Sequence, residues 1–362
     1  MSPEEGRLIL AGSVSGIVGG ANTIIISLYL LKLGLDPFEV GLLLSGGVIV
    51  SSSISFALSL LGDAYGRRPF AVGGRAISAC GLLLLASGVP AGYLFSSSWG
   101  AGSLLNSLLM EKSRSIERSL SVQSALSILF SVVGSLVPAL LGYRPILFLD
   151  VAVVLASGLL VFGVREEYRG QGGINLRLRS LRLLSKLSTE ALIGLGAGLV
   201  IPLMSLWFYL RFSVSAEEMS PVFVASNLTL ALATLSSSRM AAALGRVKTI
   251  VVTHAGAVIL LAILPFSFSF PLASVIFVSR NALMNMSGPL FSSMILRLLP
   301  PNERSRGNAL INLMESVPRA VGPSVGGYLF NSGNLSLPFL ITSVLYTLST
   351  AGFYILFRKS TV

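Results

Sequence analysis

The sequence predicts an all-α membrane protein with twelve transmembrane helices in two pseudo-symmetric six-helix bundles. The first observation is composition: the 362 residues are 53% hydrophobic and 11% charged, with a mean hydropathy of +0.82. A typical soluble domain is about 25% charged. The second observation is a series of apolar runs of membrane-spanning length, and the third is a repeat between the two halves. This composition excludes a soluble enzyme, a disordered tail and a secreted disulfide scaffold.

Twelve apolar runs, separated by short polar or turn-rich breaks, are the expected helices. The first run follows acidic residues and exceeds the 7–15 residues of a signal-peptide apolar core, so we expect a retained helix. The first six runs are 8–31, 39–61, 70–89, 91–110, 120–142 and 145–164. The next six are 189–210, 220–238, 249–266, 270–293, 307–330 and 335–357. We therefore expect an N-terminal bundle over 1–164 and a C-terminal bundle over 189–362.

The segment 165–188 is the longest polar break, and we expect it to be a cytoplasmic linker. Its first part is rich in charged residues and glycine. Its second part alternates Leu with Arg and Lys, which is typical of a basic amphipathic helix on an anionic membrane surface. A solvated tether is the alternative, and the sequence does not decide between the two.

The distribution of basic residues predicts the orientation in the membrane. If the N-terminus is cytoplasmic and the helices alternate, cytoplasmic segments hold 21 of the 26 Lys and Arg residues, and the opposite side holds 3. The remaining two, Arg280 and Arg319, lie inside expected helices. This asymmetry follows the positive-inside rule, so we attribute the net charge of +11 to topology and not to nucleic acid binding. We expect a multi-pass protein of the inner (plasma) membrane with both termini cytoplasmic.

The two halves repeat short motifs in register. A short cap that includes glutamate opens each helix, starting at Asp36 in the second and at Ser215 in the eighth. A glycine followed by basic residues closes each helix, at Gly66 and Gly245. The interval between the two caps is identical to the interval between the two glycines. The fifth and eleventh helices also share a glycine at a similar interval, Gly134 in one and Gly322 in the other. Two halves of the same orientation imply a pseudo-two-fold axis along the membrane normal, with a central site between them.

The loop between the second and third helices resembles the most specific motif of the major facilitator superfamily of secondary transporters, G-x-x-x-D-[RK]-x-G-[RK]-[RK]. In this chain it runs from Ser59 to Arg68, with four matching residues: Asp63, Gly66, Arg67 and Arg68. The second copy keeps Gly245, Arg246 and Lys248, with Ala242 in place of the acid. The resemblance covers essentially the whole chain. It implies alternating access, a monomer, and a latching role for these residues at the cytoplasmic gate.

The eleventh helix carries a second motif that is similar to the family's G-P-x-x-G-G pattern. Its residues are Gly322, Pro323, Gly326 and Gly327. In drug/proton antiporters of the family this pattern usually marks the fifth helix, so its place here does not assign the chain to the antiporters. Glycine and proline together allow close packing and a bend. We expect these residues to take part in the conformational change.

Charged residues within the membrane are costly, so each is a functional hypothesis. Arg280 lies in the middle of the tenth helix, where a guanidinium would favour a carboxylate or phosphate on a substrate. The alternative is that Arg280 pairs with Glu315 and holds the C-terminal bundle together. Glu315 and Arg319 are spaced i,i+4 and can also pair with each other, or Glu315 can serve as a protonatable coupling group.

Four uncharged residues are further candidates for substrate binding. The resemblance implies that the first, fourth, seventh and tenth helices line the transport cavity. These helices carry Asn22, Asn106, Trp207 and Asn285, respectively. For each of them the alternative role is packing between helices.

Several classes of function lack their motifs in this chain. There is no P-loop for ATP, no H-E-x-x-H metal motif, and only one cysteine and one histidine, so we expect no enzyme, metal or cofactor. The predicted function is secondary active transport of a small organic solute, with export favoured over import because the cavity reads as apolar. The coupled version of this function is proton-driven efflux by an antiporter. The alternatives are an organic-anion importer or uniporter that uses Arg280, and a lipid scramblase or transport-dead receptor on the same fold. The expected partners are the solute, the lipid bilayer and, in the coupled version, protons.

Overall fold

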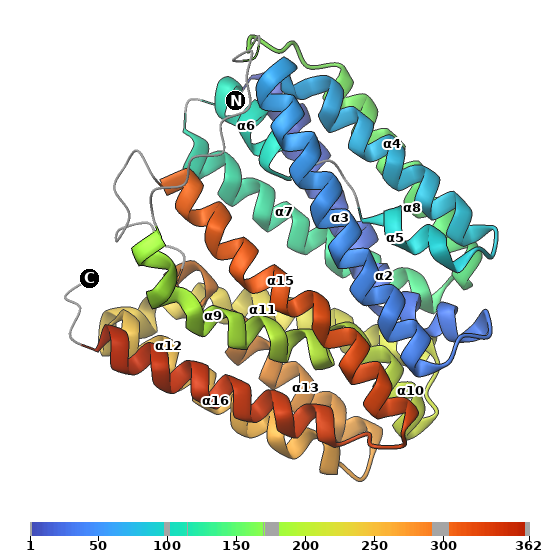
Figure 1. Ribbon diagram of the computed structural model, residues 1–362, viewed down its shortest axis with the longest axis vertical. Helices are drawn as coiled ribbons and strands as arrows, with labels where there is room; N and C mark the ends of the chain where they lie inside the picture. Colours follow the sequence, from blue (N-terminus) through green and yellow to red (C-terminus); the bar gives the residue numbers. More distant parts are fainter. Residues whose placement is uncertain are drawn as a thin grey trace. The chain divides into compact units, whose positions relative to one another are not determined.

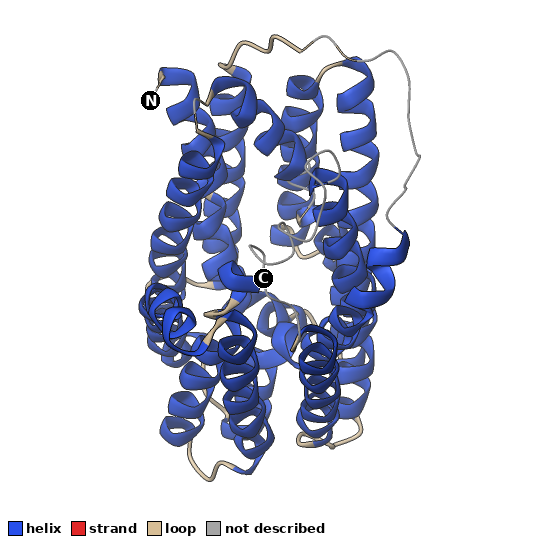
Figure 2. Ribbon diagram, turned by 90° about the vertical axis from the view of Figure 1, so that its left-hand side faces the viewer, coloured by secondary structure: helices blue, strands red, loops and turns tan. Residues whose placement is uncertain are grey.

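The computed structural model describes residues 2–97, 102–113, 115–168, 170, 181–291 and 304–358. Over these ranges the chain forms helices joined by short loops and turns (Figures 1 and 2). The helices group into twelve successive segments of the described chain, in the order that the apolar runs predict. The predicted all-α architecture is therefore confirmed.

The N-terminal half holds six of these segments. Several are interrupted: Val14 separates the two helices of the first segment, and the fourth begins with a 3₁₀ turn at Pro90–Gly92. The segments are α1 (Pro3–Ser13) with α2 (Ser15–Lys32), α3 (Pro37–Tyr65), α4 (Arg67–Ala86), α5 (Tyr93–Ser96) with α6 (Gly102–Lys112), α7 (Ile116–Leu136) and α8 (Tyr143–Phe162).

The C-terminal half holds the other six. They are α9 (Leu181–Val200) with α10 (Met204–Phe212), α11 (Ala216–Leu244), α12 (Arg246–Ile263), α13 (Phe270–Asn285), α15 (Arg304–Asn331) and α16 (Leu337–Phe357). Of the predicted amphipathic basic segment, residues 171–180 lie outside the described residues, and the rest opens α9. Helix ends differ from the sequence prediction by a few residues because hydropathy does not register the polar first and last turns.

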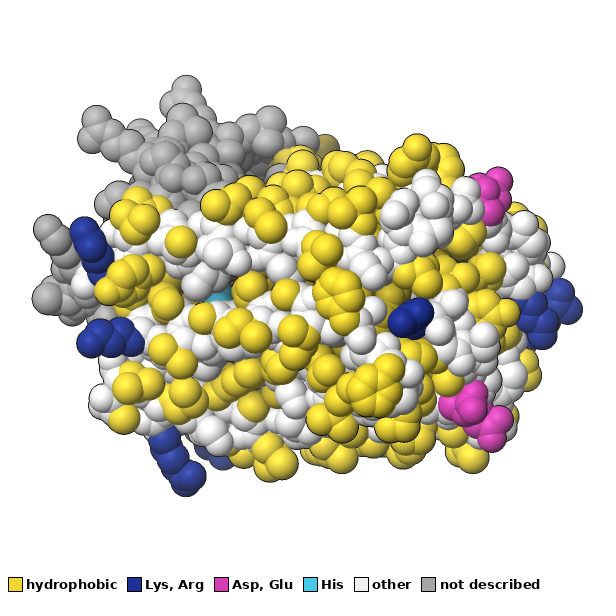
Figure 3. Space-filling view, turned by 90° about the horizontal axis from the view of Figure 1, so that it is seen from below, with side chains coloured by type: hydrophobic (Ala, Val, Ile, Leu, Met, Phe, Trp, Pro, Cys, Tyr) yellow, Lys and Arg dark blue, Asp and Glu magenta, His cyan; other side chains and the backbone are white. Residues whose placement is uncertain are grey.

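Nine helices in the described part of the chain are long and apolar enough to cross a membrane, by length and composition. Many of their large apolar side chains are exposed, including Phe56, Leu159, Leu235 and Val252. Figure 3 shows one such face, where hydrophobic side chains dominate and charged ones lie mostly toward the two ends. Large exposed apolar surfaces are costly in water and favourable in lipid.

The chain divides into two compact units. Unit 1 comprises residues 1–35, 43–176 and 216–224, and unit 2 comprises 36–42, 177–215 and 225–362. Each unit therefore includes the first residues of a helix from the other half of the sequence, either the start of α3 or the start of α11. A cluster of leucine, isoleucine, valine and alanine side chains from α1, α4, α6 and α8 forms a core of unit 1.

Helices α2 and α7 of unit 1 are packed through their backbones. A Cβ atom on Gly16 would overlap the carbonyl oxygen of Ser127, and one on Gly20 would overlap that of Ser131. Only glycine allows this approach, which is the usual role of small residues at helix contacts in membranes.

Helices α9 and α15 of unit 2 make the same contact. A Cβ atom on Gly194 would overlap the carbonyl oxygen of Glu315, and one on Gly198 would overlap that of Arg319. Gly194 and Gly198 follow Gly16 and Gly20 of α2 at one constant sequence interval. Glu315 and Arg319 follow Ser127 and Ser131 of α7 at a second constant interval. The repeat found in the sequence is therefore also a repeat of individual backbone contacts.

Local sequence explains how α3, α4 and α12 begin. At α3, the Asp36 side chain accepts a hydrogen bond from the Glu39 amide at 2.8 Å, and Glu39 accepts one from the Asp36 amide at 2.9 Å. This is a reciprocal capping box. At α4 and α12 the residue before the helix is Gly66 (φ 110°, ψ 141°) or Gly245 (φ 81°, ψ 153°). Such dihedral angles are essentially restricted to glycine, which accounts for both motif glycines.

Candidate functional site

A cavity of about 530 Å³ opens within unit 1, in the size range of small-molecule sites. Its wall is formed by α1, α2, α4, α6 and α7. The lining residues are Ala11, Gly12, Ser15, Arg75, Leu105, Asn106, Leu120, Gln123, Ser124, Ser127 and Ile128. Six of these carry polar or charged side chains, and none is acidic, so the cavity offers hydrogen bonds and one positive charge.

Arg75 supplies the charge. It is only 3% exposed, its Nε donates to Ser157 Oγ at 2.8 Å, and its Nη1 donates to the carbonyl of Ala71 at 2.7 Å. No carboxylate among the described residues lies within ion-pair distance of it. The charge count placed Arg75 with the cytoplasmic residues, and this is wrong: the third helix begins at Arg67, so Arg75 lies in its third turn. A basic residue inside a helical apolar run was the available signal.

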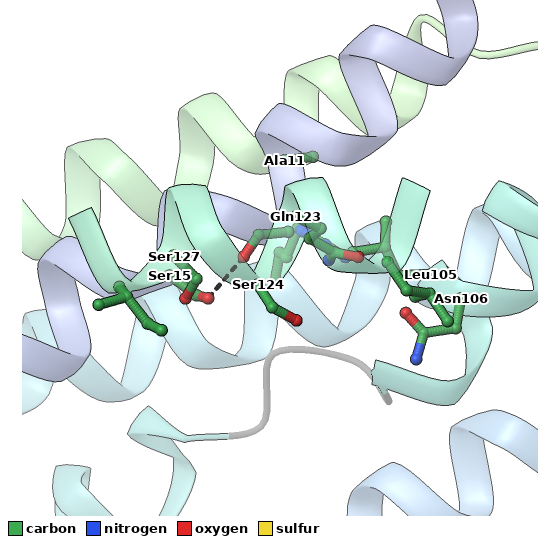
Figure 4. Close-up of a pocket in the computed structure, with 11 residues that line it drawn as sticks. Ala11, Ser15, Leu105, Asn106, Gln123, Ser124 and Ser127 are labelled. Carbon is green, nitrogen blue, oxygen red and sulfur yellow. Dashed lines mark hydrogen bonds between the residues drawn. The ribbon is translucent and has the colours of Figure 1, made fainter. Parts of the chain in front are cut away.

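Polar side chains from two further helices line the cavity near its arginine. Figure 4 shows Gln123 and Ser124 on α7 and Asn106 on α6 among the lining residues. The Gln123 side chain lies directly against Gly12, where a Cβ would overlap it. Asn106 was predicted because the resemblance places the fourth helix at the cavity, whereas Gln123 lies on the fifth helix and was not predicted.

Arg280 is the buried guanidinium of unit 2, at 2% exposure. Its Nη2 donates to the hydroxyl of Tyr346 at 3.3 Å, and its Nε is buried without a hydrogen-bond partner. The guanidinium carbon lies 5.6 Å from the centre of the Tyr346 ring. Glu315 instead pairs with Arg319. In the described part of the chain, Arg280 has no carboxylate within 4 Å, so its charge is available to an anionic ligand.

His254 lies close to Arg280 on the neighbouring helix α12, with Nε2 at 3.1 Å from Ser287 Oγ. It follows Arg75 in the sequence at the same interval that separates the two repeated loops. The third helix of each half therefore carries a basic side chain at the same position of the repeat, Arg75 on α4 and His254 on α12.

The other predicted binding residues occupy different surroundings. Trp207 is fully buried in an aromatic cluster with Phe208, Phe212 and Phe339. Asn285 is exposed. It donates to the Asn281 side chain at 2.8 Å, and Asn281 donates to Ser226 at 2.7 Å. Asn22 faces α8, with its Oδ1 buried and unpaired. These residues do not line the cavity of unit 1.

The loop between α3 and α4 forms a charged cluster. Arg67 contacts Asp63 at 3.2 Å and Glu111 at 2.9 Å, and its guanidinium carbon lies 4.0 Å from the centre of the Tyr168 ring. The Tyr168 hydroxyl donates to the carbonyl of Asp63 at 2.8 Å. Two of the predicted gating residues, Asp63 and Arg67, are thus brought together. Glu111 and Tyr168 complete the cluster and were not predicted.

The start of the predicted linker is held against this loop. Glu166 accepts hydrogen bonds from the backbone amides of Arg67 and Arg68, the latter at 2.9 Å, and so caps α4. A carboxylate at a helix N-terminus also interacts favourably with the helix dipole. Lys112 bonds Glu167 at 2.6 Å and Glu4 at 3.2 Å. The hydrogen bond to Glu167, with a contribution from Glu4, raises the pKa of Lys112.

The equivalent loop before α12 has a simpler environment. Gly245 has the same backbone conformation as Gly66. A Cβ atom added to Gly66 would contact Glu166, whereas no described atom lies within 4 Å of the Cβ position of Gly245. Arg246 has no ion pair with any described residue. The loop conformation is repeated, but the charged cluster is not.

The motif residues of α15 act through their backbones. Gly322 and Gly326 pack against the backbone of α9, and Gly327 packs against the carbonyl of Pro37. The carbonyl of Pro323 lies against Gly41, also from the start of α3. Both neighbours from α3 belong to unit 2. The motif therefore provides close helix packing, as its glycines predict.

Taken together, the residues that line the cavity of unit 1 offer hydrogen-bonding groups and one positive charge. No group of three or more His, Cys, Asp and Glu residues among them is arranged to hold a metal ion.

Comparisons with known proteins agree with this architecture. Residues 187–361 match the sequence model of the Major Facilitator Superfamily. No curated protein sequence matches the chain.

Several solved structures of transporters resemble the whole chain. The nucleoside transporter NupG has a TM-score of 0.77 at 13% identity, over 99% of this chain and 100% of its own. The human organic anion transporter MFSD10 (TETRAN) has a TM-score of 0.70 at 16% identity, over 98% of this chain and 100% of its own. A D-xylose-proton symporter has a TM-score of 0.73 at 15% identity, over 96% and 97%. These likenesses show that the chain shares the fold of these proteins.

Proposed function

Because residues 187–361 match the Major Facilitator Superfamily and the chain shares the fold of solved transporters, we propose that it carries a small organic anion across the membrane by secondary active transport with alternating access. The observation that carries this proposal is the pair of buried guanidinium groups, Arg75 and Arg280, one in each unit. Neither has a carboxylate partner among the described residues.

A buried arginine without a counter-ion is costly in a membrane protein, so it is kept where a ligand or pathway needs it. The planar guanidinium suits a carboxylate or phosphate, which it can bind through two parallel hydrogen bonds. The unpaired Nε of Arg280 is a donor of this kind. The polar wall around Arg75 supplies further donors from Gln123 and Asn106.

The expectation of export rested on an apolar cavity. The cavity of unit 1 has six polar or charged lining residues beside five without a polar side chain, and its one charge is positive, which supports an anionic solute. We therefore place anion transport ahead of proton-coupled efflux by an antiporter.

We also propose that Asp63, Gly66, Arg67 and Arg68, with Gly245 and Arg246 in the second half, form the cytoplasmic part of the conformational switch. The ion pairs of Arg67 and the cap by Glu166 support this role, since such contacts can stabilise one state selectively. Apart from Arg75, which lies inside α4, the predicted cytoplasmic segments hold 20 basic residues against 3 on the opposite side, and this distribution supports cytoplasmic termini in a plasma membrane. A monomer is the proposed working unit.

The test is a binding panel on purified protein in detergent, read as thermal stabilisation. It includes benzenesulfonate, succinate and glucose 6-phosphate as anions, with neutral sugars and cationic drugs. A ligand at 100 times its Kd stabilises a protein by about 2.7 kcal/mol. We expect an anion to stabilise the wild type, and Arg280→Gln to weaken its binding by about tenfold to a hundredfold, the worth of a charge-assisted hydrogen bond of about 1.5–3 kcal/mol.

Arg75→Gln tests the second guanidinium in the same way. Arg239→Gln is the matched control, because it removes the same charge from an exposed position on α11. Anion affinity that is equal in the Arg75, Arg280 and Arg239 variants would refute the proposal, as would binding confined to neutral or cationic compounds.

A further inference from the structure

Asp150 is a fully buried acid in a membrane-spanning helix. It lies at 0% exposure on α8, whose mean hydropathy is 2.4. Seven residues separate it from the start of the helix, about 10 Å along the axis. Both of its carboxyl oxygens are buried, and neither has a hydrogen-bond partner among the described residues. Neither the cavity nor the loop cluster uses it.

The polar group that faces Asp150 is the carboxamide of Asn22 on α2. Asn22 Oδ1 is likewise buried and unpaired. A carboxamide carries an acceptor, Oδ1, and a donor, Nδ2, whereas an ionised carboxylate only accepts hydrogen bonds. The unpaired atom of Asn22 is its Oδ1, and this oxygen can bond Asp150 only when the carboxyl group carries a proton.

No described cation neutralises Asp150. The helices packed against α8 are α1, α2 and α4. Arg75 is the buried cation among them, and it bonds to Ser157, two helical turns from Asp150. Lys32 lies over the Tyr143 ring at 5.4 Å, and the Tyr29 hydroxyl donates to the carbonyl of Leu85. The other titratable groups on these elements are Glu4, Glu5, Arg7, Arg67, Arg68, Cys80, Tyr143 and Arg144. None of the cations forms an ion pair with Asp150.

An unpaired aspartate at the centre of a membrane helix costs about 2.5–3.5 kcal/mol even on the mildest scale. Protonation removes the charge and supplies the missing donor. We propose that Asp150 is a proton-binding site of unit 1, occupied in this conformation and hydrogen-bonded to Asn22, and that this proton is exchanged during transport. The coupling role rests on the proposed anion transport, whereas the proton site does not.

The proton step is a simple acid dissociation. The O–H bond of the Asp150 carboxyl breaks, the electron pair stays on the carboxylate, and water on one side of the membrane takes the proton. An asparagine at this position would fill the same space with similar hydrogen bonds. What the carboxyl adds is the ability to release a proton.

The first experiment needs no substrate. Infrared spectra of the protein reconstituted in liposomes are recorded at neutral pH for the wild type and Asp150→Asn. We expect the difference spectrum to contain the C=O band of a hydrogen-bonded carboxylic acid, and Asn22→Leu to shift this band to the position of a free acid. Carboxylate bands in place of the acid band would overturn the proton site.

The second experiment tests coupling in the same liposomes. The probes are radiolabelled benzenesulfonate, succinate and glucose 6-phosphate, each measured in counterflow and in accumulation driven by a pH gradient. We expect Asp150→Asn to keep counterflow and to lose gradient-driven accumulation by at least tenfold, while Glu217→Gln, an exposed control, keeps both. Retained accumulation, or equal loss of both activities, would overturn the coupling role. Absence of counterflow in the wild type would refute anion transport for these probes and coupling with it, while the infrared result stands alone.

Discussion

The contact of α2 with α7 and the contact of α9 with α15 are built alike but carry different chemistry. In both, glycines of the first helix lie against carbonyl oxygens of the second, at matching sequence intervals. The residues whose carbonyls are covered are Ser127 and Ser131 in one unit, and Glu315 and Arg319 in the other. The backbone contact has been preserved in both copies, whereas the side chains at the same positions have diverged from hydroxyls to an ion pair.

The largest effect is expected from filling these contacts. We expect Gly20→Val and Gly198→Val each to cost about 3 kcal/mol, because the new side chain would meet backbone that cannot move aside. Thermal unfolding in detergent and the yield of monodisperse protein measure this. Gly19→Val is the matched control, since nothing lies within 4 Å of its Cβ position. If only one of the two substitutions lowers the stability, the two glycine contacts do not contribute equally to the stability of their units.

A smaller effect is expected where the two loops differ. Glu166→Ala removes the cap of α4 and should cost about 1–2 kcal/mol of stability. Its neighbour Glu167 pairs with Lys112 from a largely exposed position, so Glu167→Ala should cost at most about 1 kcal/mol. Unfolding curves of the two variants give the comparison. Equal losses would mean that the cap contributes nothing beyond surface charge.

The smallest effect concerns the side chains that diverged. A double-mutant cycle between Glu315→Gln and Arg319→Gln should give a coupling of about 0.2–1 kcal/mol, as for other half-exposed pairs. The cycle between Glu315→Gln and Arg280→Gln should be additive, because the observed partner of Arg280 is Tyr346. Coupling in the second cycle and not in the first would favour the alternative pairing that the sequence allowed.

The architecture was predictable because a membrane segment must be apolar over its whole length, and the loops between segments must be polar. The regular spacing of the repeated motifs also carried over into matching backbone contacts. Helix ends were less predictable, and Arg75 was misplaced, because hydropathy averages over a window and a single charge near its edge is assigned to the loop.

The candidate site was predicted only in part. Arg280 was identified because a charge is unusual in an apolar run, and Asn106 because the resemblance places the fourth helix at the transport cavity. Gln123 and Ser124 belong to the cavity through the face of α7 that they occupy, and the weak amphipathicity of a membrane helix hides that face. The isolation of Asp150 could not be inferred either, since it depends on which residues of three other helices surround it.

The glycine contacts have a consequence for how such a protein can evolve. A helix interface built from backbone atoms does not specify the side chains that project away from it, so those positions can change without loss of the fold. Ser127 lines a cavity, and its counterpart Glu315 carries a charge, on helices packed in the same way. A duplicated gene of this design can acquire a new specificity in one half while the other half preserves the scaffold.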